Sequence, residues 1–195
     1  VVLDICCYKN SEIINATFVE SLRKNDPKDA LKFETRVLRF VLPLKVSEKT
    51  ANLVKLENST ASSVLNNGKV FCTPELMTNV SCVYPCINYL NYSGVEYQFF
   101  YAVAMDFDDN YGSLVKIDLK NNTKIFWKAE NSFAWQPNFV PSPSASSEDD
   151  GIIIAGISYY GTPNKVGFVI INAKDFKEIA RCEFVDLSTA IPLAL

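Results

Sequence analysis

Short apolar segments separated by turn residues run along the whole chain. Segments rich in β-branched and aromatic residues predict strands at Val1–Tyr8, Glu34–Leu44, Asn52–Leu56, Lys69–Cys72, Glu96–Met105, Ser113–Leu119, Lys124–Lys128, Gly151–Tyr159, Val166–Ile171 and Glu178–Phe184. Clusters of Asn, Asp, Gly, Pro and Ser lie between them. Only Val19–Leu31 favours a helix, and Pro27 interrupts it. The pattern predicts an all-β protein: a sandwich, a barrel or a propeller.

An internal repeat favours the propeller among these. Leu114–Trp127 aligns without gaps on Phe168–Arg181, 54 residues further along the chain. Each copy predicts a hairpin whose turn opens at Asp118 or at Asn172. A two-stranded hairpin cannot bury its apolar face alone, so sheets that stack on one another, as propeller blades do, suit such a unit.

Composition excludes several classes of function. The 195 residues are 48% hydrophobic, which is enough for a packed core, and the net charge is −3. Lys and Arg are scattered among acidic residues, so no basic face for nucleic acid is expected. No apolar run approaches the roughly 18 residues of a membrane span.

The cysteines favour a reducing compartment. Cys6 and Cys7 are adjacent on a predicted strand and would point to opposite faces, which disfavours a disulfide between them. Cys82 and Cys86 have no second pair or histidine to complete a zinc site. We therefore expect reduced thiols and a cytoplasmic protein, in which free cysteines pack as small apolar side chains.

Secretion is the alternative. Asn-x-Ser/Thr motifs begin at Asn15, Asn58, Asn79, Asn91 and Asn121, and they would carry glycans in a secreted protein, for instance an adhesive propeller. The chain is rich in Asn, Ser and Thr, so some of these motifs arise by chance.

Few side chains suit catalysis. The chain has no histidine, which excludes Ser-His and Cys-His catalysis and any His-bound metal within it. The acidic segment Glu148–Gly151 lacks the alternating oxygen ligands of a calcium loop, so we expect a solvated turn that leads into an apolar strand at Ile152–Ile154. The many aromatic residues predict core packing or an apolar tunnel.

Five segments in register resemble one family, the carotenoid oxygenases, which include the animal β-carotene cleaving enzymes and the isomerohydrolase of the retinal pigment epithelium. They are Asp4–Lys9 (D-x-C-C-aromatic-K), Arg39–Leu44 (R-Y/F-V-L-P-L), Pro85–Tyr89 (P-x-I/V-N-Y), Phe139–Pro143 with Glu148–Gly151 (F-V-P-x-P and E-D-D-G), and Ile171–Arg181. Their order and spacing match the family across nearly the whole chain.

The resemblance implies a seven-bladed propeller with one Fe(II) on its axis, held by four histidines. Such enzymes use O2 to cleave a conjugated double bond of a carotenoid or apocarotenoid, and the isomerohydrolase branch acts on retinyl esters. Residues 1–195 would be the C-terminal part of a single propeller domain, truncated at both ends and forming its last three or four blades. We therefore expect the iron ligands outside the chain, and an inactive isolated chain.

The resemblance also marks two departures around the iron. In the family, glutamates accept a hydrogen bond from the iron-bound histidines, which fixes the tautomer. Two of these positions are Val83 and Gln136 in this chain. A shifted alignment would instead make Glu75 the nearest upstream carboxylate. We expect weakened iron binding in the whole protein, or a paralogue that binds a carotenoid or retinoid without chemistry.

Tyr8 and Tyr84 are the candidate substrate-facing residues. Tyr8 matches a family aromatic near the substrate cavity, and Tyr84 adjoins the position of Val83. The alternative for each is packing in the core. The expected partners are an apolar carotenoid or retinoid, O2 and, peripherally, a membrane.

Overall fold

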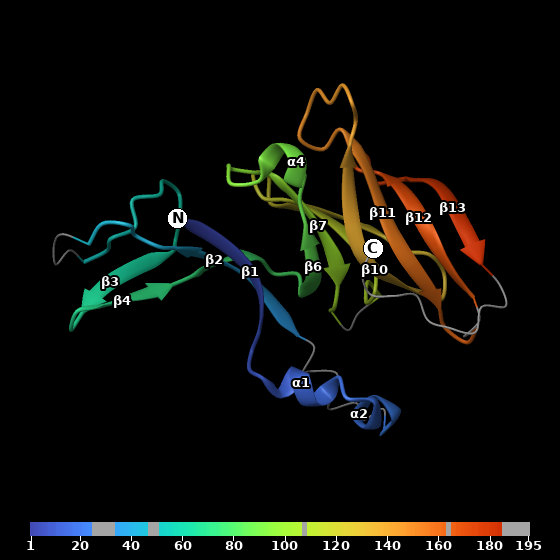
Figure 1. Ribbon diagram of the computed structural model, residues 1–195, viewed down its shortest axis with the longest axis horizontal. Helices are drawn as coiled ribbons and strands as arrows, with labels where there is room; N and C mark the ends of the chain where they lie inside the picture. The colour runs from blue at the N-terminus through green and yellow to red at the C-terminus, as the bar shows by residue number, and fades with distance from the viewer. Residues whose placement is uncertain (25–33, 47–50, 107–108, 163–164, 185–195) are drawn as a thin grey trace. The chain divides into compact units, whose positions relative to one another are not determined.

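The computed structural model describes residues 1–24, 34–46, 51–106, 109–162 and 165–184 (Figure 1). The chain divides into two compact units, Val1–Val80 and Ser81–Leu195. Strands dominate both units, so the predicted all-β class is confirmed. None of the helices in the described part has the length and apolar character needed to cross a membrane.

The first unit contains a three-stranded antiparallel sheet and a separate hairpin. The sheet has the order β1-β2-β5, with β1 at Val2–Tyr8, β2 at Thr35–Val41 and β5 at Glu75–Thr78. The hairpin joins β3 (Ser62–Asn66) to β4 (Lys69–Thr73). Two short helices, α1 (Glu12–Ala16) and α2 (Val19–Lys24), follow β1.

Two of the motif residues pair across the first two strands of this sheet. Asp4 and Arg39 face each other across β1 and β2, and the guanidinium donates two hydrogen bonds to the carboxylate at 2.8 and 2.7 Å. This bidentate geometry suits Arg and not Lys.

The hairpin of β3 and β4 turns through Asn67 and Gly68, both at positive φ, as a two-residue turn requires.

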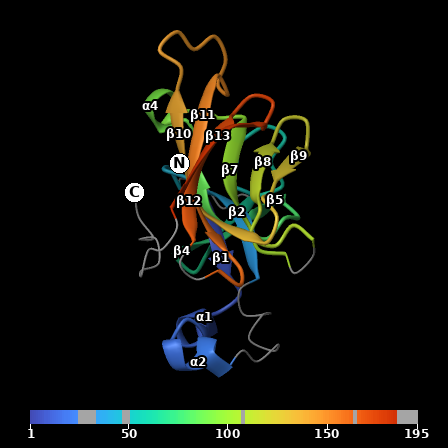
Figure 2. The same ribbon diagram turned by 90° about the vertical axis from the view of Figure 1, so that its right-hand side faces the viewer.

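The second unit contains two four-stranded antiparallel sheets, each in sequence order (Figures 1 and 2). The first comprises β6 (Cys82–Cys86), β7 (Phe99–Ala104), β8 (Leu114–Asp118) and β9 (Thr123–Trp127). The second comprises β10 (Ser132–Pro141), β11 (Gly151–Tyr159), β12 (Val166–Asn172) and β13 (Glu178–Phe184). The short helix α4 (Tyr89–Tyr92) follows β6. Four-stranded meanders of this kind are the blades of a propeller.

Aromatic stacking joins the two sheets. Strand β10 lies against β6 and β7. Tyr101 on β7 is fully buried, and its ring stacks on Phe139 and Phe176 at centroid distances of 5.5 and 6.1 Å. Burial, and then the charges of Asp149, Glu148 and Cys86, raise the pKa of Tyr101, so it stays neutral. These aromatics therefore serve blade-to-blade packing.

The internal repeat is confirmed as two equivalent hairpins, β8–β9 and β12–β13. The side chains of Asp118 and Asn172 each accept hydrogen bonds from the backbone N–H groups two and three residues further on. The equivalent residues Asn122 and Phe176 both have positive φ, 52° and 59°. The two turns thus share their conformation as well as their sequence pattern.

Several predicted elements differ from the structure. The strand expected at Asn52–Leu56 is wrong: the Asn52 side chain accepts the N–H groups of Val54 and Ser63 and holds a loop there. The expected helix at Val19–Leu31 is present only as α2, and residues 25–31 lie outside the described residues. Strands β3, β5, β6 and β10 were not predicted, and β6 and β10 contain prolines, which argue against strands.

We predict that replacing the turn-opening carboxylate destabilises the protein in a pH-dependent way. Burial tends to raise the pKa of Asp118, but hydrogen bonds from Asn121, Gln98 and the backbone hold it below its usual value. Asp118→Ala should cost on the order of 1 kcal/mol at neutral pH, from the lost hydrogen bonds. Because the folded pKa is lowered, this stabilisation is present above the unfolded pKa of about 3.9 and is lost as pH falls through the folded pKa.

Urea unfolding at a series of pH values measures the effect. The matched control is Asn172→Ala. Asn172 begins the equivalent turn but does not titrate, so this substitution should lower the free energy of unfolding by the same amount at every pH. A deficit of Asp118→Ala that does not shrink in acid would contradict this account.

Candidate functional site

The position of Val83 lies beside a bulge in the first strand of its sheet. Val83 pairs with Val103 on β7, the next pair joins Cys86 to Tyr101, and the two residues between them are left without a partner. The first of these, Tyr84, has a φ of +55°, a conformation that bulky residues rarely adopt. Val83 itself is only 7% exposed, so it fills an apolar environment where the resemblance implies a hydrogen-bond acceptor.

The position of Gln136 lies within a matching bulge of β10. Ala134 pairs with Ile157 and Pro137 with Ala155, which leaves Trp135 and Gln136 between them. The Trp135 indole donates to Ser158 Oγ at 3.1 Å. Gln136 is half-buried, and its amide makes no hydrogen bond to the residues that the structure describes. The side-chain amide oxygen of Gln136 is able by its chemistry to accept a hydrogen bond.

The bulge in β6 and the bulge in β10 occupy equivalent positions in the β6–β7 and β10–β11 strand pairs. The partners on β11, Ile157 and Ala155, lie 54 residues beyond Val103 and Tyr101 on β7. The pair Tyr84–Pro85 thus corresponds to Trp135–Gln136, and Gln136 corresponds to Pro85 rather than to Val83. Bulges redirect side chains locally, and sequence patterns do not reveal them. Val83 therefore lies in the paired part of β6, whereas Gln136 lies within the bulge of β10.

The alternative carboxylate, Glu75, is already engaged. It begins β5 in the first unit, and one of its oxygens accepts from the Ser59 hydroxyl at 3.0 Å and from the backbone N–H of Thr60 at 2.7 Å. This carboxylate binds the segment at Ser59 and Thr60. The contact disfavours Glu75 as the hydrogen-bond acceptor that the resemblance implies at the position of Val83.

The candidate substrate-facing residues belong to different units. Tyr8 ends β1 in the first unit, and Tyr84 lies in the bulge of β6 in the second. Both rings are partly exposed on their own units. Their contact with a substrate stays a prediction.

The described residues contain no group of three or more Cys, Asp or Glu side chains that could hold a metal ion, and the sequence has no histidine. All six cysteines are free thiols. Burial raises the pKa of Cys86 and of Cys7, so neither is activated as a thiolate.

The acidic segment before β11 is not the solvated turn that its composition suggested. Asp149 is buried, and its carboxylate accepts from Lys116 Nζ on β8 at 2.7 Å. The same ammonium donates to the Lys174 carbonyl at 2.8 Å and lies 4.4 Å from the centroid of the Phe99 ring. A buried charge is tolerated when it is paired and hydrogen-bonded in this way. The overlooked signal was Lys116, a basic residue flanked by the apolar residues Val115 and Ile117.

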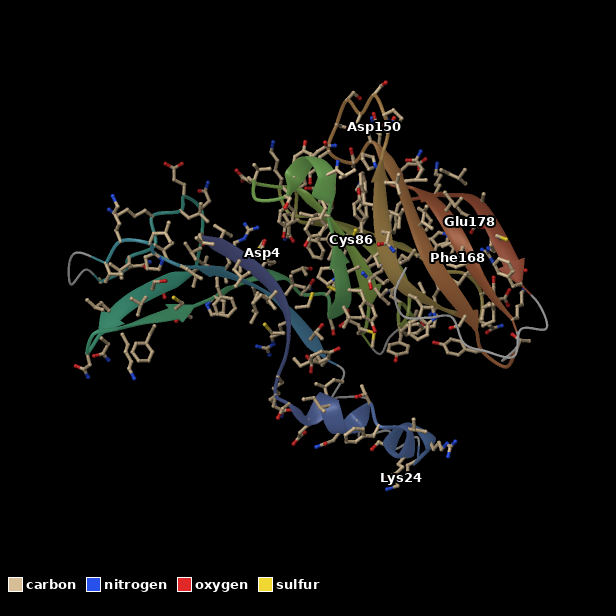
Figure 3. The ribbon with its side chains drawn as sticks, viewed as in Figure 1. Asp4, Lys24, Cys86, Asp150, Phe168 and Glu178 are labelled. Atoms are coloured by element: carbon tan, nitrogen blue, oxygen red, sulfur yellow. The ribbon has the colours of Figure 1, made fainter. Side chains whose placement is uncertain are left out.

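The neighbouring acids have partners of their own. The Glu148 carboxylate accepts the backbone N–H groups of Gln98 and Phe99 at 2.7–2.9 Å, and its carbonyl accepts from Asn88 at 3.1 Å. Asp150, labelled in Figure 3, accepts from the backbone N–H of Ser146 in the loop before β11. The acidic segment therefore ties β11 to β7, to β8 and to the start of α4.

The ion pair sets the charge state of Asp149. Burial alone would raise the pKa of its carboxyl, but hydrogen bonds from Lys116 and Ser147 and the charge of Lys116 hold that pKa below its usual value. The Asp149 carboxylate therefore stays ionised at neutral pH. This arrangement fixes the sheet of β6 to β9 against the sheet of β10 to β13.

A sequence profile described as "Retinal pigment epithelial membrane protein" matches residues 1–195, the entire chain. The chain belongs to this family, the carotenoid oxygenases. The carotenoid isomerooxygenase of Drosophila melanogaster is 30% identical and is aligned over 94% of the chain and 41% of that relative. The mitochondrial carotenoid-cleaving dioxygenase of Mustela putorius furo is 35% identical over 94% of the chain and 36% of that relative. The carotenoid oxygenase chain thus spans about two fifths or less of these relatives.

Solved structures agree on the fold. A chimera of ACO and RPE65 aligns with a TM-score of 0.62 at 22% identity, over 94% of the chain and 33% of its own length. Cobalt-substituted Synechocystis ACO aligns with a TM-score of 0.62 at 21% identity, with the same coverage. Likeness at this level shows the fold, and it confirms that the carotenoid oxygenase chain is part of a β-propeller.

We predict that breaking the buried ion pair on one side destabilises the fold. Lys116→Met or Asp149→Asn alone should lower the free energy of unfolding by about 3–5 kcal/mol, because one partner is left buried and unpaired. The double variant Lys116→Met with Asp149→Leu should recover most of that loss. Because the folded pKa of Asp149 is lowered, the contribution of the pair should disappear in acid as pH falls through that pKa.

Thermal and urea unfolding of the single and double variants test this prediction. Lys177→Met, at an exposed ion pair with Asp175, is the control and should change the free energy of unfolding by no more than about 1 kcal/mol. Equal losses at the buried and the exposed pair would refute a special role for Lys116.

Proposed function

We propose that the protein containing this chain is an Fe(II)-dependent dioxygenase that cleaves a conjugated double bond of a carotenoid or apocarotenoid with O2. The observation that carries the proposal is the family match over all 195 residues, together with relatives named as carotenoid-cleaving enzymes. The apolar substrate, the use of O2 and a cytoplasmic location belong to the same proposal.

The iron is proposed for the whole protein and not for these residues. The described part of the chain does not fit an iron site, because it offers no histidine and no cluster of other ligands. A metal in the parent is supported by the likeness to a cobalt-substituted ACO. The ligands would then lie outside this chain, which covers about two fifths or less of its relatives.

Val83 on β6 and Gln136 on β10 support the proposal that the iron site is weakened. An apolar, buried Val83 cannot accept a hydrogen bond from an iron-bound histidine. Gln136 can accept one through its free amide oxygen but brings no negative charge. Loss of such partners typically lowers metal affinity or activity about 10–100-fold.

Two other functions remain candidates. A retinoid isomerohydrolase would use the same fold on a retinyl ester, as the family resemblance implies. A paralogue that binds a carotenoid or retinoid without converting it is favoured by the buried valine at position 83.

Turnover by the full-length protein distinguishes the three. Purified protein is loaded with Fe(II) and incubated with a carotenoid under isotopically labelled O2, and in parallel with a retinyl ester. Cleavage to labelled aldehydes supports the dioxygenase, and conversion of the ester alone supports the isomerohydrolase. Stoichiometric binding without any product would overturn both enzyme proposals in favour of the binding paralogue.

We predict that restoring a carboxylate at position 136 strengthens iron binding. Gln136→Glu should lower the dissociation constant for Fe(II) in the full-length protein by about tenfold or more, because the charge raises the basicity of a bound histidine. Metal-buffered titration measures the constant without reference to turnover. Asn138→Asp, half-buried on the same strand, is the matched control for added charge. An equal gain from both variants would indicate a general charge effect and would refute the specific role of Gln136.

A further inference from the structure

The turn of the β3–β4 hairpin contains the dipeptide Asn67-Gly68. It lies where β3 ends and β4 begins, at the left of Figure 1, and both residues are exposed. Asn67 has a φ of 49° and Gly68 a φ of 76°, the left-handed conformations of a two-residue hairpin turn. The side-chain amide carbon of an asparagine and the next backbone nitrogen can join in a cyclic imide, and a glycine has no Cβ to hinder this reaction.

Neither reacting group is held in another contact. Within the described part of the chain, the Asn67 side chain has no hydrogen-bond partner, and the Gly68 N–H donates to no carbonyl. A Cβ placed on Gly68 would meet no atom within 4 Å, so the space around the attacking nitrogen is open. The strand ladder fixes only the flanking pair, Asn66 and Lys69. The side chain of Asn67 is therefore free to turn toward the Gly68 nitrogen.

Asp150 is the other residue of this chemical type that precedes a glycine, and its surroundings are the opposite. Its carboxylate accepts from the backbone N–H of Ser146 at 3.0 Å. A Cβ on Gly151 would lie 2.4 Å from the Val140 carbonyl oxygen. Packing therefore leaves no room for the same ring closure at Asp150.

Three other asparagines share the left-handed conformation of Asn67 but not its neighbour. Asn58, Asn122 and Asn131 have φ values of 60°, 52° and 50°, and all are exposed. Each is followed by serine or threonine. At Asn122 the next residue is Thr123, whose β-branched side chain crowds the backbone nitrogen. Asn67 alone combines the exposed turn with a glycine.

We propose that Asn67 is a site of spontaneous deamidation. The Gly68 nitrogen gives its proton to water and bonds to Cγ of Asn67, and the side-chain nitrogen takes up a proton and leaves as ammonia. Water then opens the cyclic imide. Cleavage between Cγ and the Gly68 nitrogen yields aspartate, and cleavage between that nitrogen and the main-chain carbonyl carbon yields isoaspartate. Nothing is oxidised or reduced, and water is the only co-reactant.

The modification changes the hairpin in two ways. Both products add a negative charge at the turn, and isoaspartate also inserts the Cβ carbon into the backbone. The length of a turn sets the register of its strands, so isoaspartate should disturb the pairing of Asn66 with Lys69. This inference does not depend on the proposed enzyme activity.

Incubation of the folded, full-length protein in water labelled with heavy oxygen tests the proposal. Peptide mass spectrometry then follows the labelled oxygen that ring opening introduces. The Asn67 peptide should gain the label at least about tenfold faster than the Asn122 peptide, because Thr123 hinders the attack on Asn122. Asn122 is thus a control with the same backbone conformation in the same molecule.

Thr123→Gly is the matched variant, and it leaves the β3–β4 hairpin untouched. It should accelerate labelling of Asn122 about tenfold or more, since the crowding side chain is removed. An unchanged rate at Asn122 would refute the role given to the glycine. Equal rates at Asn67 and Asn122 in the unaltered protein overturn the proposal. Labelling of Asn67 in urea but not in the folded protein also overturns it, because the fold would then keep the two groups apart.

Discussion

The buried pair of Lys116 and Asp149 is the interaction on which the second unit depends. Two charges are removed from water, and this is tolerable only because the ammonium also reaches a backbone carbonyl and an aromatic face while the carboxylate also accepts from Ser147. The pair fixes where β11 begins, since Gly151 follows two residues later. A Cβ at Gly151 would lie 2.4 Å from the Val140 carbonyl oxygen, so only glycine allows this approach.

Several residues that carry the family resemblance have structural roles. Asp4 and Arg39 pair across the first sheet, Asn88 and Glu148 connect α4 to the loop before β11, and Asn172 opens a turn. These contacts all lie between residues of this chain. A chain can therefore match the family along its entire length whatever side chains stand at positions 83 and 136, since these contacts involve other residues.

The two matched bulges link this architecture to function. Each interrupts the ladder of the first strand in its sheet, next to the positions where the resemblance places partners of the iron ligands. The left-handed conformation of Tyr84 shows that the surrounding structure maintains an unfavourable backbone there. This strained residue adjoins Val83, the position where the resemblance implies a hydrogen-bond acceptor.

The sequence by itself determined the all-β class, the positions of β11 and β13, the repeated hairpins and the family. Each of these depends on local signals: alternation, turn-forming side chains at Asp118 and Asn172, and short motifs in register. Only the tertiary structure decided that Lys116 and Asp149 meet, that Glu148 turns inward, and that Gln136 occupies the bulge position equivalent to Pro85 in the other sheet. Those outcomes depend on contacts between residues 33 to 50 positions apart and on bulges that shift the register of a strand, and neither leaves a periodic trace in the sequence.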